Sequence, residues 1–151
     1  MTKERKIQMK KSPKTRLEFP AESQNEGFAR IFAASYSARL DPTLEELADI
    51  KTVISEAVTN AIVHAYPGKR GTVYITAQVV DGNVLEFCVK DRGTGIENVE
   101  KAMEPMFTTG GEERSGMGFT IMQSFTDKVT VTSKTGKGTC VKLRKRIRGR
   151  V

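Results

Sequence analysis

Alternating and helical patterns of apolar residues predict one short strand and one helix in the first forty residues. Residues 16–19 alternate polar and apolar and stop at a proline, which is typical of an edge strand. Apolar residues then recur every three or four positions over residues 28–40, which predicts an amphipathic helix. Ser23 and Glu26 have the spacing of a helix capping box, so we expect this helix to start at Ser23. Asp41-Pro42 ends it.

A second helical pattern follows at once, with Thr43 and Glu46 as its capping box. Its expected buried stripe consists of Leu44, Leu47, Ile50, Ile54, Val58 and Ala61. A different face carries Glu56, Asn60 and His64, which are four residues apart and therefore about one turn, roughly 5–6 Å, from one another. A carboxylate, an amide and an imidazole should thus share one wall of this helix.

The second half of the chain reads as two hairpins and two further helices. The expected elements are strands at 72–80 and 84–90 around a turn at 81–83, a short helix at 97–103, a helix at 118–125, and a closing hairpin of strands at 129–132 and 139–143. This order predicts an α+β sandwich, in which one mixed, mostly antiparallel sheet is covered on one face by helices.

Length and charge suggest one domain with basic ends. The chain has 151 residues and a formal net charge of +7. Residues 1–16 carry seven basic residues and one acidic residue, and residues 142–151 carry six basic residues and none that is acidic. We interpret residues 1–16 as a basic leader, 17–143 as the folded domain and 144–151 as a basic tail. Direct nucleic-acid binding is not expected, because neither end interleaves aromatic residues with its charges and the middle of the chain is acidic.

The cysteines and the hydropathy pattern favour a soluble protein of a reducing compartment. Cys88 and Cys140 are 52 positions apart, and neither has a second cysteine or histidine at ligand spacing, so we expect neither a zinc site nor a disulfide. No apolar run approaches the roughly 20 residues that span a bilayer, and no signal-peptide pattern appears. The sequence therefore predicts a cytoplasmic protein without membrane contact.

One glycine-containing loop has the chemistry of a base-binding site. Asp91 closes a strand and is followed by Gly93 and Gly95. An aspartate at this position can accept a hydrogen bond from an exocyclic amine such as that of adenine, and glycines let the backbone approach a ring without a Cβ between them. Taken alone, the motif is also typical of an ordinary tight turn.

Other residues have the chemistry of a phosphate and metal site. The 116–118 glycine turn opens a helix, where free N–H groups and the helix dipole suit a phosphate, and Arg114 could reach a terminal phosphate. Asn60 offers an amide oxygen for Mg²⁺, and Glu56 could accept a proton from an attacking hydroxyl. Each residue alone is equally consistent with a solvated position. His64 could accept a phosphoryl group, but its place at the helix end favours a structural role.

Together these motifs resemble the GHKL ATPase superfamily and, within it, the anti-sigma factor serine kinases of the sporulation type. The resemblance covers residues 17–143. Its most specific stretches are residues 23–30, 40–43, 50–61, 107–109 and 113–122.

The resemblance implies ATP and Mg²⁺ as cofactors, with Glu56 as general base and Asn60 as the metal-holding residue. It implies a nucleotide site made of Asn60, Asp91, Gly93, Gly95, Thr108, Arg114, Ser115, Gly116, Met117, Gly118, Phe119 and Thr139. Arg30, on the polar side of the first helix, is the candidate for partner contact.

The resemblance also implies a homodimer that binds a sporulation sigma factor of the sigma F type and phosphorylates a serine of an anti-anti-sigma factor. A sensor histidine kinase is disfavoured, since only about sixteen residues precede the first strand. A stress-response anti-sigma kinase is a nearer alternative. From another functional class, a nucleotide-gated module that sequesters a partner without phosphorylating it stays open.

Overall fold

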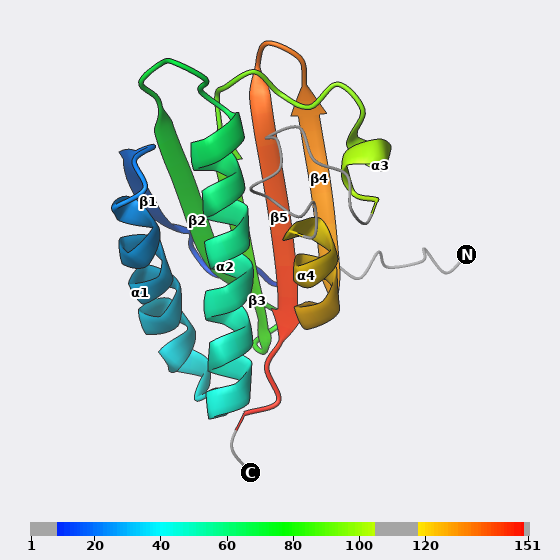
Figure 1. Cartoon of the computed structure of the whole chain (residues 1–151). Helices are drawn as coiled ribbons and strands as arrows, with labels where there is room; N and C mark the ends of the chain where they lie inside the picture. Colours follow the sequence, from blue (N-terminus) through cyan, green and yellow to red (C-terminus); the bar gives the residue numbers. More distant parts are fainter. Residues whose placement is uncertain (1–8, 105–117, 150–151) are drawn as a thin grey trace, which may run out of the picture.

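In the computed structural model, which describes residues 9–104 and 118–149, helices cover one face of a single sheet (Figure 1). The sheet has the order β1-β2-β3-β5-β4, and every neighbouring pair is antiparallel. The strands are β1 (Thr15–Pro20), β2 (Thr72–Val80), β3 (Val84–Asp91), β4 (Lys128–Lys134) and β5 (Gly138–Arg146). The helices are α1 (Asn25–Ser37), the 3₁₀ helix η1 (Ala38–Leu40), α2 (Leu44–His64), α3 (Val99–Ala102) and α4 (Gly118–Phe125). The predicted α+β fold is confirmed, although the described sheet is antiparallel throughout rather than mixed.

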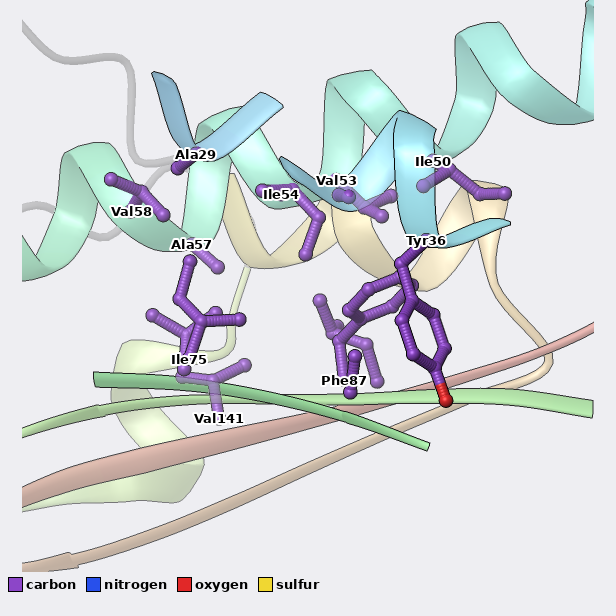
Figure 2. Close-up of a cluster of buried hydrophobic side chains, with 14 of the residues drawn as sticks. Ala29, Tyr36, Ile50, Val53, Ile54, Ala57, Val58, Ile75, Phe87 and Val141 are labelled. Carbon is purple, nitrogen blue, oxygen red and sulfur yellow. The ribbon is translucent and has the colours of Figure 1, made fainter. Parts of the chain in front are cut away.

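The core lies between α1 and α2 on one side and the sheet on the other (Figure 2). Strand side chains alternate between the two faces of the sheet, so every second residue of β3, such as Leu85, Phe87 and Val89, points toward the helices. Figure 2 shows Ile54 and Ala57 of α2 above Ile75 and Phe87 of the sheet. The helix layer is therefore fixed on the sheet. The side of α2 that carries Glu56, Asn60 and His64, which we call its polar wall, is left for other contacts.

Helix α2 begins as predicted. The Thr43 hydroxyl accepts a hydrogen bond from the Glu46 N–H at 3.1 Å, and the Glu46 carboxylate accepts one from the Thr43 N–H at 3.0 Å. The expected buried stripe is only partly right: Leu44 is 77% exposed, because it precedes the part of the helix that faces the sheet. The buried face gains Val53 and Ala57 instead.

Helix α1 does not begin with the predicted capping box. It starts at Asn25, and no side chain caps its first turn. Glu26, the expected partner of Ser23, instead accepts a hydrogen bond from the Ser55 hydroxyl of α2 and lies 3.3 Å from Arg30. A partner on a neighbouring helix has therefore replaced the local cap.

The apolar residues of α1 are divided between core and surface. Ala29, Ala33 and Tyr36 are buried, whereas Phe28 and Ile31 are 55% and 68% exposed. Small side chains let α1 approach α2 closely, so the alanines rather than the large residues face the core. Periodicity identified the helix but not its buried side.

Cys88 and Cys140 are joined by a disulfide, so the expectation of two separate thiols is wrong. Strands β3 and β5 pair with Cys88 opposite Lys142 and Lys90 opposite Cys140. This register makes the two cysteines diagonal neighbours on one face of the sheet, with their Cα atoms 6.5 Å apart. Residues 52 positions apart in sequence carry no local signal of such a contact.

Both basic ends take part in the fold within the described residues. The Ser12 N–H donates to the Val79 carbonyl at 2.9 Å, which extends the edge of the sheet beyond β1. Strand β5 continues past its predicted end at Leu143, Ile147 is buried, and the Arg148 N–H donates to Glu46 at 2.7 Å. None of the helices in the described ranges is long and apolar enough to cross a bilayer.

Candidate functional site

The polar wall of α2 lies against the first residue of α4. A Cβ added to Gly118 would stand 3.1 Å from Asn60 Nδ2 and 3.2 Å from Glu56 Oε2. The two helices pack along each other, which brings a glycine from the second half of the chain to the carboxylate and amide predicted as a pair. His64 ends the same helix, and its backbone carbonyl accepts a hydrogen bond from the Thr94 hydroxyl at 3.4 Å.

Asp91 forms a second cluster at the end of β3. Its side chain is buried, and Oδ1 accepts hydrogen bonds from the Gly93 N–H at 3.0 Å and the Thr139 N–H at 3.2 Å. Burial raises the pKa of Asp91 above its ordinary value, although both hydrogen bonds act to lower it. The other carboxylate oxygen accepts no hydrogen bond from the described residues, so one lone-pair face remains for a ligand donor.

The glycines after Asp91 are required by packing within the protein. A Cβ on Gly93 would lie 2.0 Å from the Ala65 carbonyl oxygen, just beyond α2. Gly95 has φ +78°, and a Cβ there would lie 2.4 Å from the Lys134 carbonyl oxygen. The Thr94 N–H also donates to the Ala65 carbonyl at 2.8 Å. The loop that carries Asp91 is thereby docked on the end of the helix that carries Glu56 and Asn60.

Two residues that support this loop had no sequence signal. The Tyr66 hydroxyl donates to the Thr72 carbonyl and accepts from the Arg92 N–H, both at 2.7 Å. The Ser133 hydroxyl accepts from the Ile96 N–H at 2.7 Å and lies 2.8 Å from the Thr139 hydroxyl. Both residues lie in different elements from their partners, so neither periodicity nor a motif could have identified them.

The remaining predicted site residues fall into three groups. Phe119 is half-buried against the core, in the first turn of α4. Arg30 lies on α1, so it belongs to a different element from the Asp91 loop. Its side chain is 48% exposed and forms an ion pair with Glu26. Five predicted residues lie outside the described part of the chain: Thr108, Arg114, Ser115, Gly116 and Met117.

The polar wall fits a divalent cation that is shared with a ligand. The described residues contain no group of three or more His, Cys, Asp or Glu side chains that could hold a metal by themselves. Mg²⁺ commonly takes only one or two protein ligands and completes its shell with phosphate oxygens and water. Any larger side chain at position 118 would fill the space beside the Asn60 amide, so the glycine keeps that amide accessible to a small ligand.

Comparisons with known proteins show that the chain belongs to a family of ATPase domains. Residues 19–145 match the family model described as a histidine kinase-like ATPase domain. An anti-sigma F factor of Caldanaerobacter subterraneus subsp. tengcongensis is 56% identical over 132 residues, which cover 87% of this chain and 92% of that protein. An anti-sigma F factor of Clostridium acetobutylicum is 53% identical over 134 residues, covering 88% and 93%.

Two solved structures share the fold at low identity. The crystal structure of the RsbU and RsbW domains of a Mycobacterium tuberculosis protein matches with a TM-score of 0.64 and 18% identity. That match covers 90% of this chain and 32% of the longer one. The mycobacterial sensor histidine kinase MprB matches with a TM-score of 0.57 and 16% identity, over 89% of this chain and all of the other.

Proposed function

Because the chain belongs to the histidine kinase-like ATPase family and is more than half identical to anti-sigma F factors, we propose that it is an anti-sigma factor with serine kinase activity. In this proposal it binds a sporulation sigma factor of the sigma F type. With ATP and Mg²⁺ it phosphorylates a serine of an anti-anti-sigma factor. It acts as a homodimer in the cytoplasm.

The observation that carries this proposal is the meeting of Glu56, Asn60 and Gly118. A carboxylate, an amide oxygen and a helix-opening glycine come together on two packed helices, as a phosphoryl-transfer site needs. The docked loop after Asp91 adds a buried carboxylate whose second oxygen accepts nothing from the described residues. Each of these residues alone is consistent with a solvated position, but together they have the chemistry of a nucleotide site.

At the base end, Asp91 would accept a hydrogen bond from the exocyclic amine of adenine. The Gly93 and Thr139 N–H groups hold Oδ1, so the orientation of the free oxygen is set before a ligand arrives. A guanine ring presents a carbonyl at the position of that amine, and an ionised carboxylate would repel it. A carboxylate oxygen placed beside that amine would therefore favour ATP over GTP.

At the phosphate end, Glu56 would act as general base in the transfer. The serine oxygen forms a bond to the γ-phosphorus, the bond from that phosphorus to the β,γ-bridging oxygen breaks, and ADP leaves. The serine proton passes to Glu56 Oε. Because phosphoryl transfer depends mainly on positioning and charge neutralisation, the helix that carries Glu56 supplies orientation as well as a proton acceptor.

The remaining nucleotide contacts follow from the family resemblance. Asn60 would hold Mg²⁺, which neutralises phosphate charge when it is bound. Arg114 and the glycine turn at 116–118 would bind the phosphates, and Thr108 and Ser115 would contribute from the same segment. Phe119 and Thr139 would complete the nucleotide site.

Partner binding is assigned to α1. Arg30 is half exposed and is held by Glu26, whose carboxylate also accepts from Ser55, the residue before Glu56. A contact at Arg30 would thus be linked through Glu26 to Ser55, the residue next to the proposed general base in sequence. We assign Arg30 to contact with the sigma factor and the anti-anti-sigma factor, which would compete for overlapping surfaces.

A second candidate function is nucleotide-gated sequestration without phosphorylation. The base-binding half of the site would be the same in both cases, so nucleotide binding alone does not separate them. Phosphoryl transfer needs a general base in addition to nucleotide binding. Glu56 is the proposed general base, so it is the residue that distinguishes the two functions. The likeness to the RsbW domain, at 18% identity, supports the fold alone and favours neither function.

The test measures label transfer from γ-labelled ATP to an anti-anti-sigma protein and to its Ser→Ala version. We expect wild-type protein to label the serine-bearing partner only. Glu56→Gln should reduce the transfer rate by at least about 100-fold, the usual contribution of a general base. Its affinity for ATP and for the sigma factor should stay within about twofold of wild type.

Glu45→Gln is the matched control, because Glu45 is an exposed glutamate in the first turn of the same helix. It should transfer label at the wild-type rate. ATP binding without any transfer by wild-type protein would support the sequestering module. Full transfer by Glu56→Gln would assign the proton acceptor to another group.

A further inference from the structure

The face of the sheet that the helices leave uncovered collects positive charge on β4 and β5. Because side chains alternate, Val141 and Leu143 point to the core while Lys142 and Arg144 point outward. The register places Lys142 opposite Thr130 and Arg144 opposite Lys128. These four outward side chains line a hollow of about 220 Å³, which we call the basic hollow.

Positive charge in the basic hollow exceeds the negative charge beside it. Arg144 Nε lies 2.6 Å from Glu86 Oε2, and no ion pair of Lys128 or Lys142 occurs within the described ranges. Burial acts to raise the pKa of Glu86, but Arg144, helped by Lys142 and Lys11, outweighs it and holds that pKa below its ordinary value. Among the described residues, the Glu86 carboxylate thus faces Arg144, Lys142 and Lys11.

Protection of a sheet edge does not explain this arrangement. Lys128 lies on β4, the last strand of the sheet, where lysine commonly discourages pairing with another chain. Lys142 lies on β5, between β3 and β4, with neutral Cys88 and Thr130 as its cross-strand neighbours. A lysine on an inner strand has no edge to protect.

The opposite layer carries the opposite charge. Residues 21–64, which include α1 and α2, contain seven acidic residues and three basic ones. An acidic partner would be repelled by this layer and attracted to the uncovered face. The charge of the molecule therefore distinguishes its two faces for an approaching protein.

We propose that the basic hollow docks an acidic polypeptide segment of a protein partner. Lys128, Lys142 and the exposed part of Arg144 would pair with its carboxylates, and the Thr130 hydroxyl would add a hydrogen bond. A nucleic acid fits less well, since Tyr74 is the one aromatic side chain that the described strands direct outward. The Arg92 guanidinium already lies over it, 4.9 Å from the ring centre.

The test measures fluorescence anisotropy of a labelled decapeptide of alternating Glu and Ser, beside a matched peptide of alternating Gln and Ser. We expect wild-type protein to bind the Glu peptide and not the Gln peptide. The double variant Lys128→Glu/Lys142→Glu should weaken binding at least about tenfold, because two attractive contacts become repulsive. Lys128→Gln/Lys142→Gln, which only removes charge, should give an intermediate loss.

The matched control is Lys51→Glu/Lys69→Glu, which changes the net charge equally at two exposed positions outside the basic hollow. Its affinity for the Glu peptide should stay within about threefold of wild type, because neither lysine lines the basic hollow and salt screens the field of exposed charges. Thermal unfolding of each variant checks that the fold is intact.

Three results would overturn the proposal. Equal losses in the control and in the basic-hollow variants would mean that only net charge matters. Equal binding of the Gln peptide would remove the role of carboxylates. Binding of a labelled oligouridine, lost in the same variants while the Glu peptide does not bind, would assign the surface to nucleic acid. None of these results depends on Glu56 or ATP, so the kinase proposal stands or fails separately.

Discussion

The clusters around Asp91 and around Asn60 are held in place by different parts of the chain. Asp91 is fixed by backbone groups of Gly93 and Thr139, and its loop rests directly on the backbone of Ala65. Asn60 is fixed by one helix and approached by one glycine of α4. The comparison indicates that the base end is built by close backbone packing, whereas the phosphate end depends on side chains. A side chain added at a glycine of the first should cost stability, and one added at the glycine of the second should cost chemistry.

The largest expected effect is that of Gly93→Ala. Its Cβ would lie 2.0 Å from a backbone oxygen that cannot move alone, so we expect a loss of about 3 kcal/mol or more in the free energy of unfolding. Urea unfolding measures it. Gly82→Ala is the control: it has φ +81° with open space around it, so it should cost only about 1–2 kcal/mol. Equal losses would contradict the packing account.

Next in size is the effect of Asp91→Asn on nucleotide affinity. The asparagine oxygen can still accept from Gly93 and Thr139, but its NH₂ group would face the adenine amine. We expect ATP to bind roughly 10- to 100-fold more weakly, from a loss of about 1.5–3 kcal/mol. Calorimetric titration measures this. Unchanged ATP affinity would remove Asp91 from base recognition.

Gly118→Ala should separate chemistry from stability at the other cluster. The new methyl group would press on the ends of the Asn60 and Glu56 side chains, which can shift by a few tenths of an ångström. We expect phosphoryl transfer to slow by about tenfold, since misplacement of reacting groups is costly. The free energy of unfolding should change by less than about 1 kcal/mol. A large loss of stability with a normal rate of transfer would mean that Gly118 is needed for packing rather than for chemistry, and would contradict the distinction between the two clusters.

The smallest expected effect is a difference in pH dependence between two buried acids. The pKa of Glu86 is lowered in the folded state, so its stabilisation is present above its unfolded pKa and is lost as the pH falls through the folded value. Burial raises the pKa of Asp91, so its contribution is favourable below its unfolded pKa and is lost as the pH rises through the folded value.

At neutral pH, Glu86→Gln should therefore cost about 1 kcal/mol, while Asp91→Asn should leave stability unchanged or raise it. At a second pH, well below the ordinary pKa of a glutamate, both differences should shrink, and the Asp91→Asn difference should do so first as the pH falls, because the folded pKa of Asp91 is raised and that of Glu86 is lowered. Denaturant unfolding at the two pH values checks the signs. A stabilising Glu86→Gln at neutral pH would show that its link to Arg144 does not outweigh burial.

Most elements could be predicted because their signals are local. The Thr43 and Glu46 capping box lies within four residues, and the hairpin at 81–83 is set by its own turn. The four-residue spacing of Glu56 and Asn60 was enough to predict that they share one face of a helix. Phe28 and Ile31 show the limit of such signals, because an apolar residue on a helix does not specify which neighbour covers it.

The sequence by itself determined the elements, the α+β class and the residue types of the site, since these depend on spacing over a few residues. Only the tertiary structure decided that Thr139 holds Asp91, that Gly93 rests on Ala65 and that Cys88 meets Cys140. Strand register and helix packing join positions that are distant in sequence. Such contacts arise from burying the whole core at once, so no local pattern encodes them.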